Sequence, residues 1–333
     1  MKLVIGGNGF LGSRVVRQLV DAGERVRVLT RPTSNLRTLD GLDHEHVTGD
    51  LFDAGSVRAA MDGCDVVFHC AVDTRAWLRD PAPLYRTNVD GLRAVLDVAA
   101  GMRLRRFVFT STAATIGRPT GRRATEDDVF DWDGAPAYVR SRVAAEDLLL
   151  ARARAGSVPG VAMCVANTYG PGDLQPTPHG SFVAGAALGK LPFTVRGWCA
   201  ESVGIDDAAR ALILAADRGT VGERYIVSDR SIDMSEITAI AAREAGRRPP
   251  RLALNSPVLH AVGAIGSARA VVTRKPVQLT LPSVRLMFFM PEMDHSKAER
   301  DLGWMPRPVE EAVAEGARFW LRRAAARRAQ HAG

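Results

Sequence analysis

The sequence predicts an α/β fold of the Rossmann type, a doubly wound parallel sheet with a smaller, mostly helical C-terminal substrate-binding region. Three observations predict it. Short β-branched segments alternate with amphipathic ones through the first half, a glycine-rich turn joins the first strand to the first helix, and the pattern becomes mostly helical after about residue 234. The 333 residues are 46% hydrophobic and 24% charged, which suits a globular protein of enzyme size.

The predicted elements follow one another in a regular order. The segments expected to be strands are 2–7, 25–31, 65–71 and 105–112. The segments expected to be helices between and after them are 10–23, 83–101 and 137–155. We therefore expect residues 1–165 to form the dinucleotide-binding domain, with a strand and a helix returning to it from about 201–227. Residues 166–333 are expected to form mainly a cap over the carboxyl edge of the sheet, where ligands bind in such folds.

The motif "GGNGFLG" lies directly between the first strand and the first helix. Gly6, Gly9 and Gly12 allow a tight turn and a close approach of the backbone to a ligand, and Phe10 and Leu11 begin the helix. The helix amino end then offers free N–H groups and a favourable dipole to a pyrophosphate. This context predicts a dinucleotide site.

The end of the second strand indicates which dinucleotide binds. NAD-preferring sites place a carboxylate there, on the adenosine ribose. This chain has Thr30 and Arg31 instead, and a guanidinium can fork onto a 2′-phosphate. The sequence therefore favours NADP(H) over NAD(H). The alternative is that Arg31 faces solvent, because of the 44 lysines and arginines only four are lysines, which leaves 40 arginines.

At this point the chain resembles the extended short-chain dehydrogenases, or NAD-dependent epimerase/dehydratase family, over nearly its whole length. Within that family "GPGDLQPTPHG" and "SKAERDLGWMPRPVEEAV" resemble the bacterial dihydroflavonol-4-reductase-like and hopanoid-associated sugar epimerase-like proteins. The segments "VTGDLFD", "HCAVDT" and "YRTNVDG" are similar to family segments around the cofactor. The resemblance implies that Asp50 and Leu51 border the adenine, that Ala71 lies along the cofactor, and that Asn88 belongs to a supporting network.

The resemblance also implies the catalytic groups. Tyr138 is expected to exchange a proton with the substrate oxygen, and Thr112, with Ser111 as second choice, to hydrogen-bond that oxygen. The family places a lysine one helical turn after the tyrosine, where this chain has Arg142. Residues i and i+4 share a helix face, and a nearby cation favours the phenolate. Arginine keeps the charge but cannot give up its proton, so it could support, redirect or impair catalysis.

Three functions remain open on these residues. The first is an NADP(H)-dependent oxidoreductase acting on a carbonyl or secondary alcohol of a small or medium-sized metabolite. The second is a sugar epimerase or dehydratase that retains its NAD(P). The third is a catalytically weak dinucleotide-binding sensor or scaffold, for which Arg142 is the main support.

Other classes of function find no support in the sequence. The seven histidines form no metal-ligand cluster, no G-x-S-x-G pentapeptide occurs, and no apolar segment reaches the ~20 residues of a membrane span. The net charge of +7 comes from scattered arginines, so we expect no nucleic-acid partner. We expect a cytoplasmic protein with a small-molecule substrate. The resemblance further implies a homodimer, formed through helices 83–101 and 137–155, both of which carry apolar residues around much of their circumference.

Overall fold

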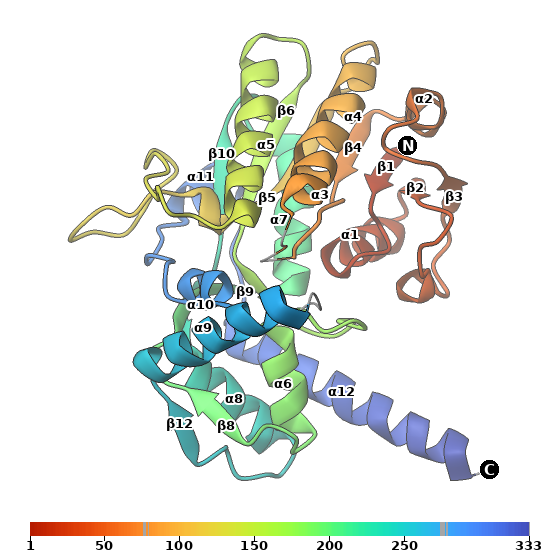
Figure 1. Ribbon diagram of the computed structural model, residues 1–333. Helices are drawn as coiled ribbons and strands as arrows, with labels where there is room; N and C mark the ends of the chain where they lie inside the picture. The colour runs from red at the N-terminus through yellow and green to blue at the C-terminus, as the bar shows by residue number, and fades with distance from the viewer. Residues whose placement is uncertain (76–77, 79, 274–276, 278, 333) are drawn as a thin grey trace.

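A seven-stranded parallel sheet with helices around it forms the upper part of the computed structural model, which describes residues 1–75, 78, 80–273, 277 and 279–332 (Figure 1). The strand order is β10-β6-β5-β4-β1-β2-β3. The strands are β1 (Lys2–Ile5), β2 (Val26–Thr30), β3 (Glu45–Thr48), β4 (Val66–His69), β5 (Arg106–Thr112), β6 (Gly160–Val165) and β10 (Arg224–Val227). This sheet confirms the predicted Rossmann-type fold class.

Helices cover both faces of the sheet, because its strands are apolar on both sides. Val4, Phe68 and Val108 pack on one face, in a core shared with α1 (Phe10–Asp21), α7 (Ile205–Arg218) and α11 (Ser296–Leu302). Leu3 and Phe107 pack on the other face, in a core shared with α2 (Ala54–Met61), α4 (Gly91–Ala99) and α5 (Ala137–Arg154). Alternate residues of each strand therefore belong to different cores.

The segment predicted as one helix over 83–101 is divided in the structure. It consists of α3 (Ala82–Tyr85), a π-helical turn η2 (Arg86–Asp90) and α4. The wider turn carries Asn88, which is buried. Wider turns of this kind often occur at functional sites. Single 3₁₀ turns, η1 (Arg37–Leu39) and η3 (Ala113–Thr115), follow β2 and β5.

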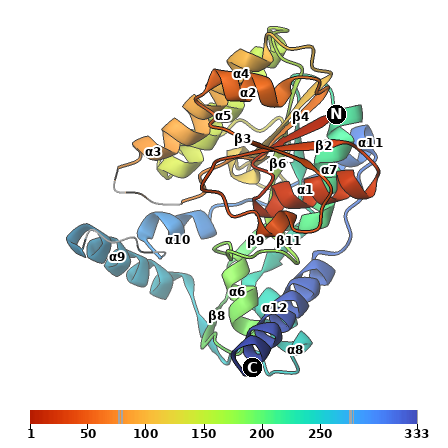
Figure 2. The same cartoon turned by 90° about the vertical axis from the view of Figure 1, so that its right-hand side faces the viewer.

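Most of the C-terminal half, apart from α7, β10 and α11, forms a cap beside the sheet (Figure 2). A three-stranded sheet, β11-β9-β7, and a strand pair, β12-β8, hold it together. Its elements are β7 (Asn167–Tyr169), α6 (Gly180–Ala187), β8 (Phe193–Val195), β9 (Cys199–Gly204), β11 (Arg230–Asp233), α8 (Met234–Glu244), β12 (Leu252–Leu254), α9 (Ser256–Thr273), α10 (Leu281–Met287) and α12 (Val309–Ala332). A separate core, which includes Val183, Trp198 and Val313, fills it. Across the described residues, no helix is both long and apolar enough to cross a bilayer.

Candidate active site

The glycine turn after β1 has the shape of a phosphate cradle. Gly6 has φ +77°, and a Cβ added there would lie 2.8 Å from the backbone nitrogen of Ala71. A Cβ on Gly12 would lie 2.4 Å from the Gly6 carbonyl oxygen, and the Gly9 N–H donates to that same oxygen at 3.0 Å. No side chain caps the amino end of α1, whose first turn begins with Phe10 and Leu11, so its N–H groups stay free for an anion. The residues present therefore fit a dinucleotide pyrophosphate.

A fourth glycine of this turn was missed by the sequence interpretation. A Cβ on Gly7 would lie 2.7 Å from Cγ1 of Val28 on β2. The small residue lets the turn lie flat on the neighbouring strand. The double glycine of "GGNGFLG" was the available signal.

At the end of β2, the Thr30 side chain is buried and the Arg31 side chain is exposed. The Thr30 hydroxyl is buried in a hydrogen bond with Nε2 of His46 at 2.8 Å. Arg31 is exposed and, in the part of the chain that the structure describes, has no ion pair or side-chain hydrogen bond. His46 lies within β3 and pairs with Val28. Its role is to hold Thr30.

The loop after β3 carries the two residues predicted beside the adenine. The Asp50 carboxylate accepts the Phe52 N–H at 2.9 Å, which shapes the turn into α2. Leu51 lies against Gly91 of α4, with 3.3 Å between its Cδ1 and a Cβ built on that glycine. Both residues thus follow the carboxyl end of a sheet strand.

Asn88 ties the loop after β4 to α5. Its side-chain oxygen, Oδ1, accepts a hydrogen bond from the backbone N–H of Asp73 at 2.8 Å. Its side-chain nitrogen, Nδ2, donates to the backbone carbonyl of Asp73 at 3.1 Å and to the Ser141 hydroxyl at 3.0 Å. Ser141 in turn donates to the Tyr138 carbonyl at 2.7 Å. Because both amide hydrogens are used within the protein, Asn88 braces the start of α5.

Tyr138 and Thr112 come together where β5 ends and α5 begins. Burial raises the pKa of the Tyr138 phenol above its usual value, although the charge of Arg142 and a hydrogen bond with Thr112 act in the opposite direction. The Thr112 oxygen also accepts the Ala114 N–H at 3.3 Å. At neutral pH the phenol is therefore protonated and lies beside a second hydroxyl group.

Arg142 lies one helical turn after Tyr138 on the same face of α5, and its side chain is buried in the protein. Its side chain is 2% exposed, and its Nη2 donates to the carbonyl of Thr110 on β5. The guanidinium carbon lies 4.8 Å from the centre of the Phe109 ring, a cation–π contact. Nη1 is buried without a hydrogen-bond partner among the described residues. Both N–H groups of this buried nitrogen thus lack an acceptor within the described protein.

Ser111, the second choice for the substrate hydroxyl, points elsewhere. Its hydroxyl donates to the carboxylate of Glu146, which lies one turn beyond Arg142 on α5. The same buried carboxylate accepts from the Thr115 hydroxyl at 3.0 Å and from Nη1 of Arg224 at 2.9 Å. Sequence reasoning missed Glu146, although the spacing 138, 142, 146 places all three on one helix face. The structure thus brings Thr112, not Ser111, to Tyr138.

His69 is a second group that sequence reasoning missed. It ends β4 and lies between the rings of Phe107 and Phe109, with ring centres 6.0 and 5.9 Å away. Burial, and to a smaller extent the charge of Arg142, lowers its pKa to about 3. Neither ring nitrogen has a partner in the described structure. A neutral imidazole therefore lies against Phe107 and Phe109, within the electrostatic influence of Arg142.

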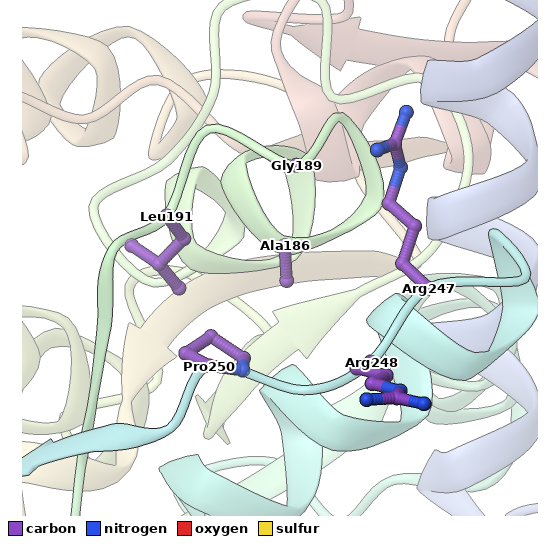
Figure 3. A pocket seen from close by; sticks show the side chains of 6 residues that line it. All are labelled: Ala186, Gly189, Leu191, Arg247, Arg248 and Pro250. Atoms are coloured by element: carbon purple, nitrogen blue, oxygen red, sulfur yellow. The ribbon is translucent and has the colours of Figure 1, made fainter.

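A cavity of about 350 Å³ lies away from these residues, in the cap (Figure 3). It is lined by Ala186, Gly189, Leu191, Arg247, Arg248 and Pro250. The two arginines point in different directions, so they do not converge on one ligand (Figure 3). Tyr138, Thr112 and Arg142 do not line this cavity. The described residues contain no group of three or more metal-ligating side chains.

Comparisons with known proteins show the family of the chain. The model of the NAD dependent epimerase/dehydratase family matches residues 2–228. A putative dihydroflavonol 4-reductase from Synechocystis sp. is 30% identical over 331 residues, covering 95% of this chain and 93% of its own. Sterol demethylase protein B from Methylococcus capsulatus is 29% identical, covering 96% and 98%.

A solved structure shows the same architecture. The crystal structure of gox2253 superposes with a TM-score of 0.84 at 29% identity, covering 97% of this chain and 98% of the other. The family model matches more than half of the chain, and both curated relatives align over nearly its full length. The chain therefore belongs to the NAD dependent epimerase/dehydratase family, whose members are nicotinamide-dependent enzymes.

Proposed function

We propose that the protein is an NADP(H)-dependent oxidoreductase that reduces a carbonyl, or oxidises a secondary alcohol, of a small or medium-sized metabolite. The observation that carries this proposal is the set of groups around Tyr138. Its phenol lies beside the Thr112 hydroxyl and the charge of Arg142. A neutral phenol supported by a cation is suited to giving a proton to a carbonyl oxygen and then holding the negative charge.

Tyr138, Thr112 and Arg142 have different roles in the proposed reaction. A bound nicotinamide supplies or accepts the hydride. Tyr138 gives its proton to the substrate oxygen as charge develops there, and Thr112 donates a hydrogen bond to the same oxygen. Arg142 stabilises the phenolate that remains, since its charge opposes the rise that burial causes in the pKa of Tyr138. Because a guanidinium keeps its proton, Arg142 does not reprotonate Tyr138, and the proton comes from water.

The surroundings of Tyr138 favour an apolar substrate. Trp132, Val143 and Leu286 of α10 belong to the same hydrophobic cluster as its ring. Apolar walls with a few polar groups are typical of sites for small organic ligands. The names of the two curated relatives, a dihydroflavonol reductase and a sterol demethylase protein, refer to multi-ring organic compounds, which supports this choice.

The cofactor preference follows from Arg31 and Thr30. No carboxylate at the end of β2 repels a 2′-phosphate, and Arg31 is exposed without a partner in the described part of the chain. NADPH should therefore bind more tightly than NADH by about 1 kcal/mol or more. Fluorescence titration of both nucleotides checks this, with Arg31→Ala expected to remove the difference. Equal affinities in the unchanged protein would contradict the assignment.

The reaction itself is tested by NADPH oxidation with a panel of apolar ketones. We expect Tyr138→Phe to lower turnover at least a hundredfold while the nucleotide dissociation constant stays within about twofold, because only the proton donor is lost. Ser111→Ala is a suitable comparison, since its hydroxyl points to Glu146. A Tyr138→Phe variant that keeps its activity would exclude this mechanism.

The other two functions give different results in the same preparation. An epimerase or dehydratase that retains its cofactor would release stoichiometric nucleotide when the purified protein is denatured, and would convert substrate without net NADPH oxidation. A sensor or scaffold would bind NADPH but show no turnover with any substrate. The buried, unpaired Nη1 of Arg142 keeps this last function open.

A further inference from the structure

Helix α9 exposes an apolar stripe to solvent. Val258, Val262, Ile265 and Val272 are 44, 41, 69 and 82% exposed. Steps of four, three and seven residues place them on one side of the helix. Within its 18 residues the only charged side chain is Arg269, which lies in the same stripe. Surface helices normally bury an apolar stripe against the core of the protein. The exposed stripe of α9 is therefore expected to bind a partner.

A different side of α9 packs on α10. Leu259, Gly263 and Ala270 are buried there, and a Cβ added to Gly263 would lie 2.9 Å from Cγ2 of Val284 on α10. The stripe therefore lies outside the contact with α10. Figure 2 shows α9 at the edge of the cap, beyond α10 as seen from the sheet.

The charge around α9 indicates what the partner is. From Ala245 to Pro291 the sequence contains no aspartate or glutamate, whereas it contains six arginines (247, 248, 251, 269, 274 and 285) and Lys275. Arg248 and Arg251, just before α9, are exposed, as is Arg269. A second copy of this face would bring the same positive charges together, which opposes self-association. An RNA or DNA would match the charge but not the apolar stripe.

We propose that α9 docks the protein on an anionic lipid bilayer. Val258, Val262, Ile265 and Val272 enter the boundary between headgroups and acyl chains, and the surrounding arginines contact the anionic headgroups. Since no helix in the described residues can cross a bilayer, α9 lies along the surface. α10, on which α9 packs, places Leu286 in the hydrophobic cluster of Tyr138. The docked face is thus separated from the candidate reaction site by a single helix.

Vesicle flotation of the full-length protein tests this proposal without any assay of activity. We expect most of the protein to float with vesicles of phosphatidylcholine containing 30% phosphatidylglycerol, and little with phosphatidylcholine alone. Ile265→Glu/Val272→Glu should reduce the bound fraction at least tenfold. Arg269→Ala, which keeps the helix intact, should reduce it severalfold. Val129→Glu puts the same charge on a valine that is 81% exposed outside the cap, and it should bind like the unchanged protein.

Circular dichroism of each variant verifies that the fold is retained. The proposal is overturned if the unchanged protein does not float with anionic vesicles, or if the double glutamate variant floats equally well. It is also overturned if Ile265→Glu/Val272→Glu changes the mass in light scattering from two chains to one, because the stripe would then join two copies.

Discussion

At the scale of single residues, Arg142 combines a permanent charge with nearly complete burial. Burial of an ion is costly unless it is well paired, and this guanidinium has a carbonyl, an aromatic ring and the negative field of Glu146 as its partners. Because the side chain is 2% exposed, it cannot reach far into a substrate site. This favours the view that Arg142 replaces the family's lysine in supporting Tyr138.

Exchanging Arg142 distinguishes a supporting charge from a specific guanidinium. Lysine keeps the charge, can bond to the Thr110 carbonyl and can also pass protons, so we expect Arg142→Lys to hold or raise kcat. Arg142→Met removes the charge and should lower kcat at least tenfold. Steady-state kinetics with parallel nucleotide titrations measure both. A loss above tenfold for Arg142→Lys, with nucleotide affinity preserved, would show that the fork geometry itself is required.

His69 should make the free energy of unfolding depend on pH. Its pKa of about 3 in the folded protein lies below the 6.5 of a free imidazole, so between these values the unfolded chain binds the extra proton. Stability should therefore fall as the pH falls, and from pH 7 to pH 5 the loss due to His69 is about 2 kcal/mol. Urea unfolding at both pH values measures it.

The matched variant for this measurement is His69→Phe, which keeps a ring between Phe107 and Phe109 but does not titrate. Asp173 and Glu201, whose pKa values burial raises to about 6, act in the opposite direction and are the same in both proteins. The difference between the two pH dependences therefore isolates His69. Parallel curves for the two proteins would show that His69 has an ordinary pKa.

At the scale of secondary-structure elements, local patterns were predictable and long-range ones were not. The β1 turn and the shared face of Tyr138 and Arg142 follow from spacing within about ten residues. The Glu146 network was not predictable in the same way. Arg224 lies 78 residues further along the chain and meets Glu146 only because β10 pairs with β6. Likewise, only the folded cap shows that α10 reaches Tyr138.

The glycine turn yields a prediction at this scale. Gly12→Ala places a methyl group 2.4 Å from the Gly6 carbonyl oxygen, so α1 must move away from the turn. We expect nucleotide affinity to fall at least tenfold, because the free N–H groups are displaced from the pyrophosphate. Calorimetric titration with NADPH measures it. Gly101→Ala is the control, since its added Cβ meets its nearest neighbour at 3.6 Å and lies far from the turn. Equal affinity of the two variants would argue against a pyrophosphate at this turn.

At the scale of the whole molecule, the outer surface of α4 and α5 is less apolar than we expected from the sequence. Leu92, Val95 and Leu149, which suggested apolar residues around both helices, pack inward on the sheet. The outer side carries an ion pair between Asp97 and Arg152 at 2.6 Å. A homodimer through these helices therefore remains a prediction that rests on the family resemblance. The apolar groups left for the contact include the partly buried Ala144 and Leu148.

Light scattering at micromolar concentration tests the assembly. We expect the mass of two chains, and we expect Leu148→Glu to give the mass of one, because a carboxylate would be buried in the contact without a partner. Val129→Glu, with its new charge on an exposed loop, should keep the mass of two chains. The mass of one chain for the unchanged protein refutes the dimer. If two chains remain together after Leu148→Glu but separate after Ile265→Glu/Val272→Glu, the contact lies on α9, and the lipid-binding role of that helix fails with it.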